Sequence, residues 1–247
     1  QNTAVGEGTL GANTTASYNT ALGENALASN TTGTQNVAVG QATLDTNTTG
    51  DNNTAVGRDA LTANTTASNN TAVGKAALTA NTTGDQNVAV GASAGLSVTT
   101  GIQNTLIGYL AGDALTDADY NTALGTSALT SDTLGSRAVA IGRNTLSSQN
   151  FTSATDNYNV AVGFSAGAQV TTGVKNTLIG GLAGDALTTA DNNTAVGYAS
   201  LTSATTADNN TAIGWAALNE TTTGANNTAV GKSALEANTT GTNNVAV

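Results

Sequence analysis

A five-residue signature, Asn-Thr-Ala-Val-Gly or a close variant of it, recurs along this chain every 17 residues. Its first residue is Asn in fourteen copies, namely Asn2, Asn19, Asn36, Asn53, Asn70, Asn87, Asn104, Asn121, Asn159, Asn176, Asn193, Asn210, Asn227 and Asn244. A degenerate copy begins at Ala138, and 21 residues separate it from Asn159, four more than the period. A short fixed period predicts a solenoid, in which each repeat forms one coil and stacks on the next.

We number each coil from its first Asn as position 1. Positions 2 to 4 alternate as in a short β-strand, with positions 2 and 4 on one face and position 3 on the other. Positions 8 and 9 are Ala-Leu in most coils, and Gly replaces this Leu at Gly95, Gly112, Gly167 and Gly184. We expect a second strand there, followed by a turn at the Asn-Thr-Thr-Gly segment. The predicted coil thus has two short strands and two turns.

Two positions of the coil are interpreted as structural. Position 5 is Gly in Gly6, Gly23, Gly40, Gly57, Gly74, Gly91, Gly108, Gly125, Gly142, Gly163, Gly180, Gly197, Gly214 and Gly231. An invariable Gly indicates a corner with positive φ or a close approach of neighbouring backbones. Stacking also places the Asn residues of position 1 about 4.8 Å apart, so we expect a ladder in which each side-chain amide bonds to its neighbours.

Composition excludes several classes of function. The 247-residue chain has no His and no Cys, which removes the commonest general base, the commonest transition-metal ligand and all thiol chemistry. Its formal charge of −10, with six Lys and Arg against sixteen Asp and Glu, argues against binding to nucleic acid or anionic membranes. No apolar run is long enough to insert into a bilayer. We expect a protein that is not an enzyme and has no metal or cofactor.

The signature resembles two families of fibre proteins. Asn-Asn-Thr-Ala-Val-Gly at residues 52–57 is similar to the head motif of YadA-type trimeric autotransporter adhesins. It also resembles the Asn-Thr-Ala-Ile-Gly arrays of phage and bacterial tail-fibre-like proteins, which often end in an endosialidase-type chaperone domain. The resemblance implies an all-β, left-handed parallel β-roll with 17-residue coils that assembles as a homotrimer outside the cell or on a virion. The heads of the adhesins have shorter coils.

The repeat predicts one β-roll domain over residues 1–247, with about fifteen coils and one four-residue insertion within 143–158. The first and last coils are cut within the repeat and carry no capping segment, so we expect a piece of a longer fibre. Narrow coils bury little apolar area per residue, and thin scaffolds commonly need oligomerisation for stability. A homotrimer is consistent with this requirement.

Position 6 is the most variable position and is expected to face outward. Its residues are Glu7, Glu24, Gln41, Arg58, Lys75, Ala92, Tyr109, Thr126, Arg143, Phe164, Gly181, Tyr198, Trp215 and Lys232. A position that accepts Lys, Trp and Gly alike cannot point into a narrow core. Tyr109, Phe164, Tyr198 and Trp215 are therefore candidate contacts for a sugar or a protein partner. The alternative is that these rings pack across a trimer interface or shield a corner.

The insertion and a recurring Asp supply two further candidates. Phe151 lies in the four-residue insertion, which is expected to bulge outward as a binding loop or to be a tolerated scar of duplication. Asp191 and Asp208 occupy position 16 of successive coils. Their carboxylates could share a divalent cation, although we favour a solvated turn because no dense calcium-loop pattern is present.

The function that these patterns favour is a structural and adhesive fibre, located outside the cell, on a cell surface or on a virion. Its expected partners are its own copies and a host-cell surface protein or glycan. An ice-binding solenoid is the alternative, but its Thr-x-Thr ranks are not matched by adjacent pairs such as Thr14 and Thr15. A polysaccharide-cleaving spike that uses paired carboxylates is less favoured, because few acidic residues recur on one face.

Overall fold

The computed structural model describes residues 1–247, which divide into two compact units, Gln1–Asn121 and Thr122–Val247. Both units are parallel β-solenoids without any helix, which confirms the predicted fold class at this level. Nothing in the structure qualifies as a membrane-spanning helix. The two units are described separately below.

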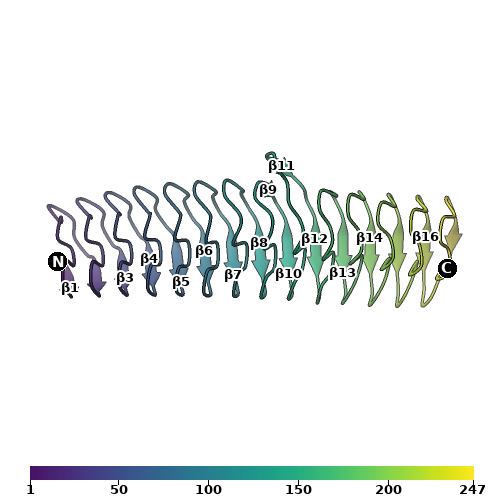
Figure 1. Ribbon diagram of the computed structural model, residues 1–247, viewed down its shortest axis with the longest axis horizontal. Coiled ribbons are helices and arrows are strands. Elements are labelled where there is room, and N and C mark those ends of the chain that lie inside the picture. The colour runs from purple at the N-terminus through teal and green to yellow at the C-terminus, as the bar shows by residue number, and fades with distance from the viewer. The chain divides into compact units, whose positions relative to one another are not determined.

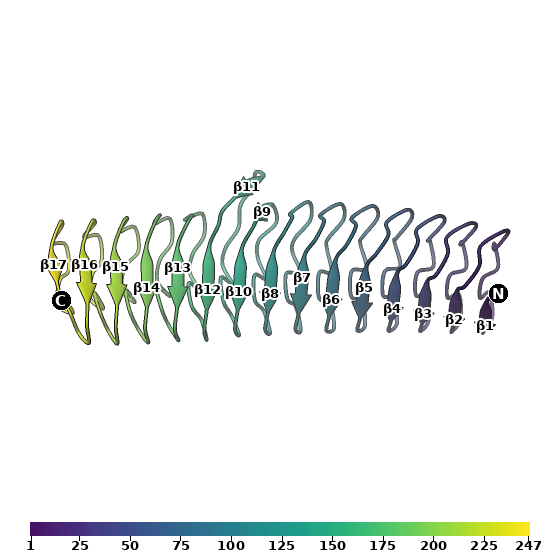
Figure 2. The same cartoon turned by 180° about the vertical axis from the view of Figure 1, so that it is seen from behind.

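The first unit (purple to teal in Figures 1 and 2) is a stack of coils with one three-residue strand in each. Its strands are β1 (Thr3–Val5), β2 (Thr20–Leu22), β3 (Val37–Val39), β4 (Thr54–Val56), β5 (Thr71–Val73), β6 (Val88–Val90) and β7 (Thr105–Ile107). Strands that are consecutive in sequence pair in parallel, and Thr3 pairs with Thr20 and Thr20 with Val37. Each residue therefore lies beside the residue one repeat later in the sequence.

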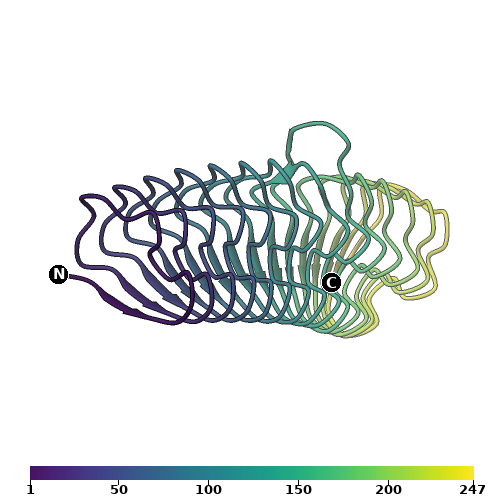
Figure 3. The ribbon, with the colours of Figure 1, turned by 60° about the vertical axis from the view of Figure 1, so that its left-hand side comes forward.

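The second unit has the same arrangement, with one addition. Its main sheet contains β8 (Thr122–Leu124), β10 (Val139–Ile141), β12 (Val160–Val162), β13 (Thr177–Ile179), β14 (Thr194–Val196), β15 (Thr211–Ile213), β16 (Thr228–Val230) and β17 (Val245–Ala246). A separate parallel pair is formed by β9 (Gly135–Ser136) and β11 (Thr155–Asp156). The segment around β11 projects beyond the neighbouring coils of this unit (Figures 1 and 3). The insertion thus adds a small two-stranded layer without breaking the register of the main sheet, since Val139 still pairs with Val160.

The strands place position 3 inside the coil and positions 2 and 4 outside. Position 3 is fully buried, as at Ala38 and Ala55, whereas the flanking residues of the same strands are half-buried. Ala suits position 3 because a larger side chain would meet the opposite wall of so narrow a coil. The Val, Leu and Ile side chains of position 4 therefore do not fill the core.

The predicted second strand is absent. Positions 8 and 9 lie in a turn, and the Leu of position 9 adopts left-handed backbone geometry, with φ values of 53° at Leu27 and 51° at Leu61. Left-handed geometry costs an L-residue about 1–2 kcal/mol. Complete burial of a Leu side chain contributes about 1.5–3 kcal/mol and offsets that cost, and both Leu27 and Leu61 are fully buried. The turn is held by hydrogen bonds between coils, such as Leu27 N–H to the carbonyl of Thr43 at 3.0 Å.

Four coils fill this core differently. In the first unit Gly95 and Gly112 occupy position 9 with φ values of 58° and 57°. A Cβ built on Gly95 would lie 2.8 Å from Leu106 Cδ1, and one on Gly112 would lie 2.7 Å from Leu106 Cδ2. Leu106 stands at position 3, where other coils have Ala, and it fills the space that two missing Leu side chains leave. In the second unit Leu178 lies in the same way between Gly167 and Gly184.

The corner at position 5 requires Gly for two reasons. All fourteen of these Gly residues have φ between 130° and 141°, a region that L-residues rarely adopt. A Cβ on Gly74 would also lie 2.4 Å from the carbonyl oxygen of Gly91. The corners of successive coils therefore approach as closely as two backbones can.

Replacement of Leu106 by Ala tests whether a Leu at position 3 takes the place of the Leu side chains that are missing at position 9. The change leaves a cavity beside both Gly95 and Gly112, so we expect a loss of about 2–5 kcal/mol in the free energy of unfolding. Gly95→Leu alone should also destabilise the protein, because its side chain would clash with that of Leu106. The double variant should recover part of the loss, measured by thermal and urea denaturation. Strictly additive losses would contradict the proposed packing.

Two corner Gly residues separate backbone strain from steric clash. Gly57 and Gly231 have φ values of 130° and 131°. A Cβ on Gly57 would lie 2.5 Å from the carbonyl oxygen of Gly74, whereas nothing lies within 4 Å of a Cβ on Gly231. Gly231→Ala should lose only the strain energy, about 1–3 kcal/mol, and Gly57→Ala should lose more. Equal shifts in thermal midpoint would show that the clash is relieved at no cost.

Candidate functional site

The Asn residues of position 1 bind mainly to the backbone and are not available to a ligand. Asn36 is fully buried, and its N–H donates to Oδ1 of Asn19 at 2.9 Å. Its Nδ2 donates to the carbonyl of Gly50 at 2.8 Å, 14 residues later and near the end of the same coil. Direct amide-to-amide bonds occur in only some coils, for example Asn104 Nδ2 to Asn87 Oδ1 at 3.1 Å. The expected ladder therefore needs correction, because side chains chiefly cross-link backbones.

A true amide ladder lies at position 12, where the sequence predicts only a turn. In the first unit Asn47 Nδ2 donates to Asn30 Oδ1 at 2.8 Å, and Asn64 Nδ2 donates to Asn47 Oδ1 at 2.7 Å. These side chains are completely buried. The signal was present in the sequence, since the Asn of Asn-Thr-Thr-Gly also recurs every 17 residues. Because Asn and Gly are also common in turns, this pattern by itself does not distinguish a ladder from a turn.

The carboxylates of position 16 close hydrogen bonds between coils. The Asp208 Oδ1 atom accepts the N–H of Asp191 at 2.8 Å, and Asp191 Oδ1 accepts the N–H of Val174 at 2.8 Å. Thr34 donates both its N–H and its hydroxyl to Asp51 Oδ1 in the first unit, at 2.6 and 3.0 Å. No group of three or more His, Cys, Asp or Glu is placed so that it could hold a metal ion. The geometry supports a capping role for Asp191 and Asp208.

The insertion is organised around a buried carboxylate. Asp132 is fully buried and accepts hydrogen bonds from Gln149 Nε2 at 2.6 Å, Phe151 N–H at 3.0 Å and Gly135 N–H at 3.1 Å. Phe151 is only 6% exposed, and a Cβ on Gly135 would lie 2.7 Å from its ring. The expectation that Phe151 lies on an outward binding loop is therefore corrected. Its ring is needed to cover the chain that accommodates the four extra residues.

Position 6 forms an exposed row along each unit, as expected. The exposed fractions are 55% for Tyr109, 54% for Phe164, 55% for Tyr198 and 49% for Trp215. Every other candidate residue is buried or belongs to the framework of the coil. The position 6 row is therefore the part of the molecule that is accessible to a partner and varied in chemistry.

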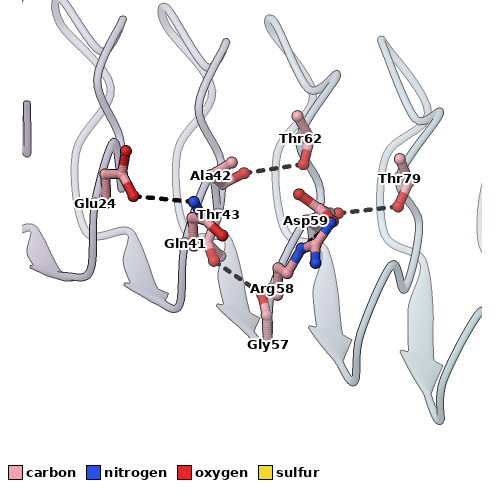
Figure 4. Close-up of polar contacts among 9 residues, drawn as sticks. All are labelled: Glu24, Gln41, Ala42, Thr43, Gly57, Arg58, Asp59, Thr62 and Thr79. Atoms are coloured by element: carbon pink, nitrogen blue, oxygen red, sulfur yellow. Dashed lines mark hydrogen bonds and ion pairs between the residues drawn. The ribbon is translucent and has the colours of Figure 1, made fainter.

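The row in the first unit is polar, and its side chains interact with one another (Figure 4). Gln41 Nε2 donates to Glu24 Oε2 at 2.9 Å, and the Arg58 guanidinium pairs with Asp59 at 2.9 Å. The backbone behind the row is braced, because Thr62 donates to the carbonyl of Ala42 at 2.9 Å. Exposed pairs of this kind contribute little to the stability of the fold. Their effect is to make the surface of this row polar.

The row in the second unit is aromatic and basic. Phe164, Gly181, Tyr198, Trp215 and Lys232 follow one another on successive coils. Lys232 Nζ lies 5.3 Å from the centroid of the Trp215 ring, within the range of a cation–π interaction. The ring of Tyr198 lies beside Gly181, since a Cβ there would be 3.4 Å from Tyr198 Cδ2. Because Gly181 has no side chain, the row is interrupted between Phe164 and Tyr198.

No known protein family and no curated protein matches this chain. Its function must therefore be inferred from the geometry of the coil and its surfaces. Two surfaces stand out by their chemistry, namely the outward sheet face of positions 2 and 4 and the position 6 row.

Asp185 offers a test of electrostatics near the row of the second unit. Burial raises the pKa of this carboxyl above its usual value, and hydrogen bonds from its own N–H and from that of Ala186 oppose the shift. Its Oδ1 has no hydrogen-bond partner. The pKa of Asp185 is higher in the folded state than in the unfolded state. The folded protein therefore gains stability as the pH falls from the folded-state pKa to the unfolded-state pKa. At a pH above the folded-state pKa, Asp185 is charged and destabilises the fold.

Asp185→Asn should therefore raise the thermal midpoint at pH 7, and the advantage should disappear below the unfolded-state pKa of Asp. Thermal denaturation across this pH range measures the effect. Asp191→Asn is the matched control, because it weakens the acceptor of the Val174 N–H and should not stabilise the protein. A stabilisation by Asp185→Asn that is independent of pH would rule out the electrostatic explanation.

Proposed function

We propose that this chain is part of a non-catalytic, trimeric fibre that acts outside the cell, on a cell surface or on a virion. In this proposal each chain is a left-handed parallel β-roll with 17-residue coils. Three chains associate through their outward sheet faces, and the position 6 rows remain free to contact a host protein or glycan. The trimer, the handedness and the location rest on the resemblance of the signature to adhesin heads and tail-fibre arrays.

The observation that carries the proposal is the apolar outer face of each sheet. In the first unit its position 4 row is Val5, Leu22, Val39, Val56, Val73, Val90 and Ile107, and in the second it is Leu124, Ile141, Val162, Ile179, Val196, Ile213 and Val230. These side chains are half-buried to exposed, with 47% exposure at Leu22 and 43% at Leu124. Contiguous exposed apolar surface on this scale marks an interaction site.

The distribution of charge supports the same conclusion. The chain has six basic and sixteen acidic residues, yet none lies in positions 1 to 5 of any coil. A solvent-facing surface of an acidic protein normally carries charged side chains. A flat sheet face with aligned Thr and Val residues is also repetitive enough to pack against copies of itself, as symmetric assembly requires. We infer that this face is covered by other copies of the chain.

The Thr residues of position 2 favour a second candidate function. Thr54 and Thr71 stand beside each other on the outer face, two positions before Val56 and Val73. This arrangement forms parallel outward ranks, which adjacent pairs such as Thr14 and Thr15 cannot form. Ice binding would use this face in a monomer, whereas a trimer would cover it. The state of assembly therefore distinguishes the two candidates.

Sedimentation equilibrium tests the proposed assembly. The wild-type chain should have a mass about three times its 24.0 kDa. Val56→Glu combined with Val73→Glu should dissociate the trimer, because it places uncompensated carboxylates in an apolar interface. Lys75→Glu introduces a similar charge at position 6, outside the interface, and should leave the mass unchanged. A monomeric wild type would contradict the proposal, and thermal hysteresis in such a monomer would favour ice binding.

A further inference from the structure

The position 6 row of the second unit has the composition of a binding site for an acidic glycan. It runs through six successive coils as Arg143, Phe164, Gly181, Tyr198, Trp215 and Lys232. A cation stands at each end, and three exposed aromatic rings lie between them. We propose that this row binds a linear oligosaccharide that carries carboxylate groups. The inference deepens the proposed adhesive function by naming the chemical class of the partner.

The row is rigid before any ligand arrives. The residue after each member donates its N–H to the carbonyl of the preceding member, from Ser165 to Arg143 at 3.0 Å through to Ser233 to Trp215 at 2.8 Å. These donors have left-handed backbone geometry, with φ of 52° at Ser165 and 55° at Ser233. Each follows a corner Gly by two positions. A pre-ordered surface loses little conformational entropy when it binds.

The spacing of the row suits an extended sugar chain. Parallel neighbouring strands lie about 4.8 Å apart, so the six coils present a ridge about 24 Å long. One coil advances by roughly the length of one sugar ring in an extended polysaccharide. Tyr198 and Trp215 are exposed aromatic side chains on adjacent coils, and aromatic rings of this kind pack against the apolar faces of sugars. Between Phe164 and Tyr198, Gly181 has no side chain of its own, and the ring of Tyr198 lies against it.

The charges of the row favour carboxylates on the sugar. Lys232 contacts the Trp215 ring, and neither it nor Arg143 forms a salt bridge. No acidic residue occupies position 6 in this unit, whereas Glu7 and Glu24 do so in the first unit. Asp185 and Glu236 at position 10 and Glu220 at position 11 are the acidic residues of the turns that follow these positions. Arg143 and Lys232, at the two ends of the row, therefore remain its cations, and each is able to pair with a carboxylate.

The shape of the row argues against a folded protein as the partner. A stable protein interface covers about 800 Å² on each side, with some 20 to 30 residues. The row is one residue wide, and most of its flanks at position 7 are small, as at Ser165, Ala199 and Ala216, with Leu182 as the large exception. A ridge of this width matches the stacking of single sugar rings along a line.

Isothermal titration of the full chain with hexagalacturonate and with a hyaluronan hexasaccharide tests the proposal, with cellohexaose as the neutral probe. At least one acidic probe should bind, more tightly than cellohexaose, and its affinity should fall as salt is added. Tyr198→Ala combined with Trp215→Ala should weaken binding about tenfold or more. Trp215→Phe should retain most of the affinity because it keeps an aromatic face.

Gly181→Glu provides the sharpest variant. Position 6 tolerates Glu at Glu7 and Glu24, so the fold should be unaffected, while the new side chain contacts the Tyr198 ring and its charge repels a carboxylate. Binding should be lost. Ala92→Glu makes a similar substitution at position 6 of the first unit and should leave the affinity unchanged.

Three outcomes would overturn the proposal: no binding of either acidic probe, equal binding of cellohexaose, or unchanged binding by Gly181→Glu. Sedimentation of the same samples separates this inference from the proposed fibre. A trimer without glycan binding refutes the site alone. A monomer refutes the fibre, whether or not the glycan binds.

Discussion

The close approach of successive corners is the constraint on which this structure depends. A Cβ at position 5 would lie far inside the van der Waals contact distance from the next corner carbonyl, as the 2.4 Å distance at Gly74 indicates. Because only Gly fits, each coil can lie directly on the preceding one. The strands then pair in register, and every other position of the repeat forms a straight row. The hydrogen-bond ladders, the core and both outer surfaces follow from this alignment.

The alignment produces two buried regions inside the coil, and the stabilising interactions are divided between them. One is apolar and contains Ala from position 3 with Leu from position 9, as at Ala55 and Leu61. The other is polar and contains the Asn side chains of positions 1 and 12, such as Asn53 and Asn64. The buried amides bond to backbone or amide groups of neighbouring coils, with the Nδ2 atom of Asn70 and the Oδ1 atom of Asn81 as exceptions. A typical hydrogen bond contributes only about 0.5–1.5 kcal/mol net, but an unpaired buried amide would cost more. The ladders therefore enforce register as much as they add stability.

So narrow a coil has consequences for function. Because Ala and Leu supply most of its apolar interior, the branched side chains of position 4 remain on the outer face, and the chain presents an uncharged apolar sheet to its surroundings. The corner then directs position 6 away from that sheet. One repeat thus separates a surface suited to assembly from a surface suited to recognition. The variation at position 6, from Glu24 to Trp215, is compatible with the fold because these side chains have no role in the core.

The sequence alone determined the parallel solenoid, the period, the need for Gly at position 5 and the outward direction of position 6. Periodicity was sufficient for these features, since identical residues repeated at equal spacing align in any stacked coil. It could not decide which side of the strand faces inward. That choice depends on the path by which the rest of the coil closes, and closure placed Ala55 inside and Val56 outside.

The tertiary structure alone decided three further points. Leu at position 9 takes a left-handed turn in place of a strand, because its burial outweighs the backbone strain. The Asn residues of position 1 bond to backbone carbonyls 14 residues later in the chain, which come within reach only when the coil has closed. Phe151 is buried because the inserted residues fold back over Asp132. Each of these outcomes depends on contacts between residues that are distant within the repeat, and no local pattern encodes them.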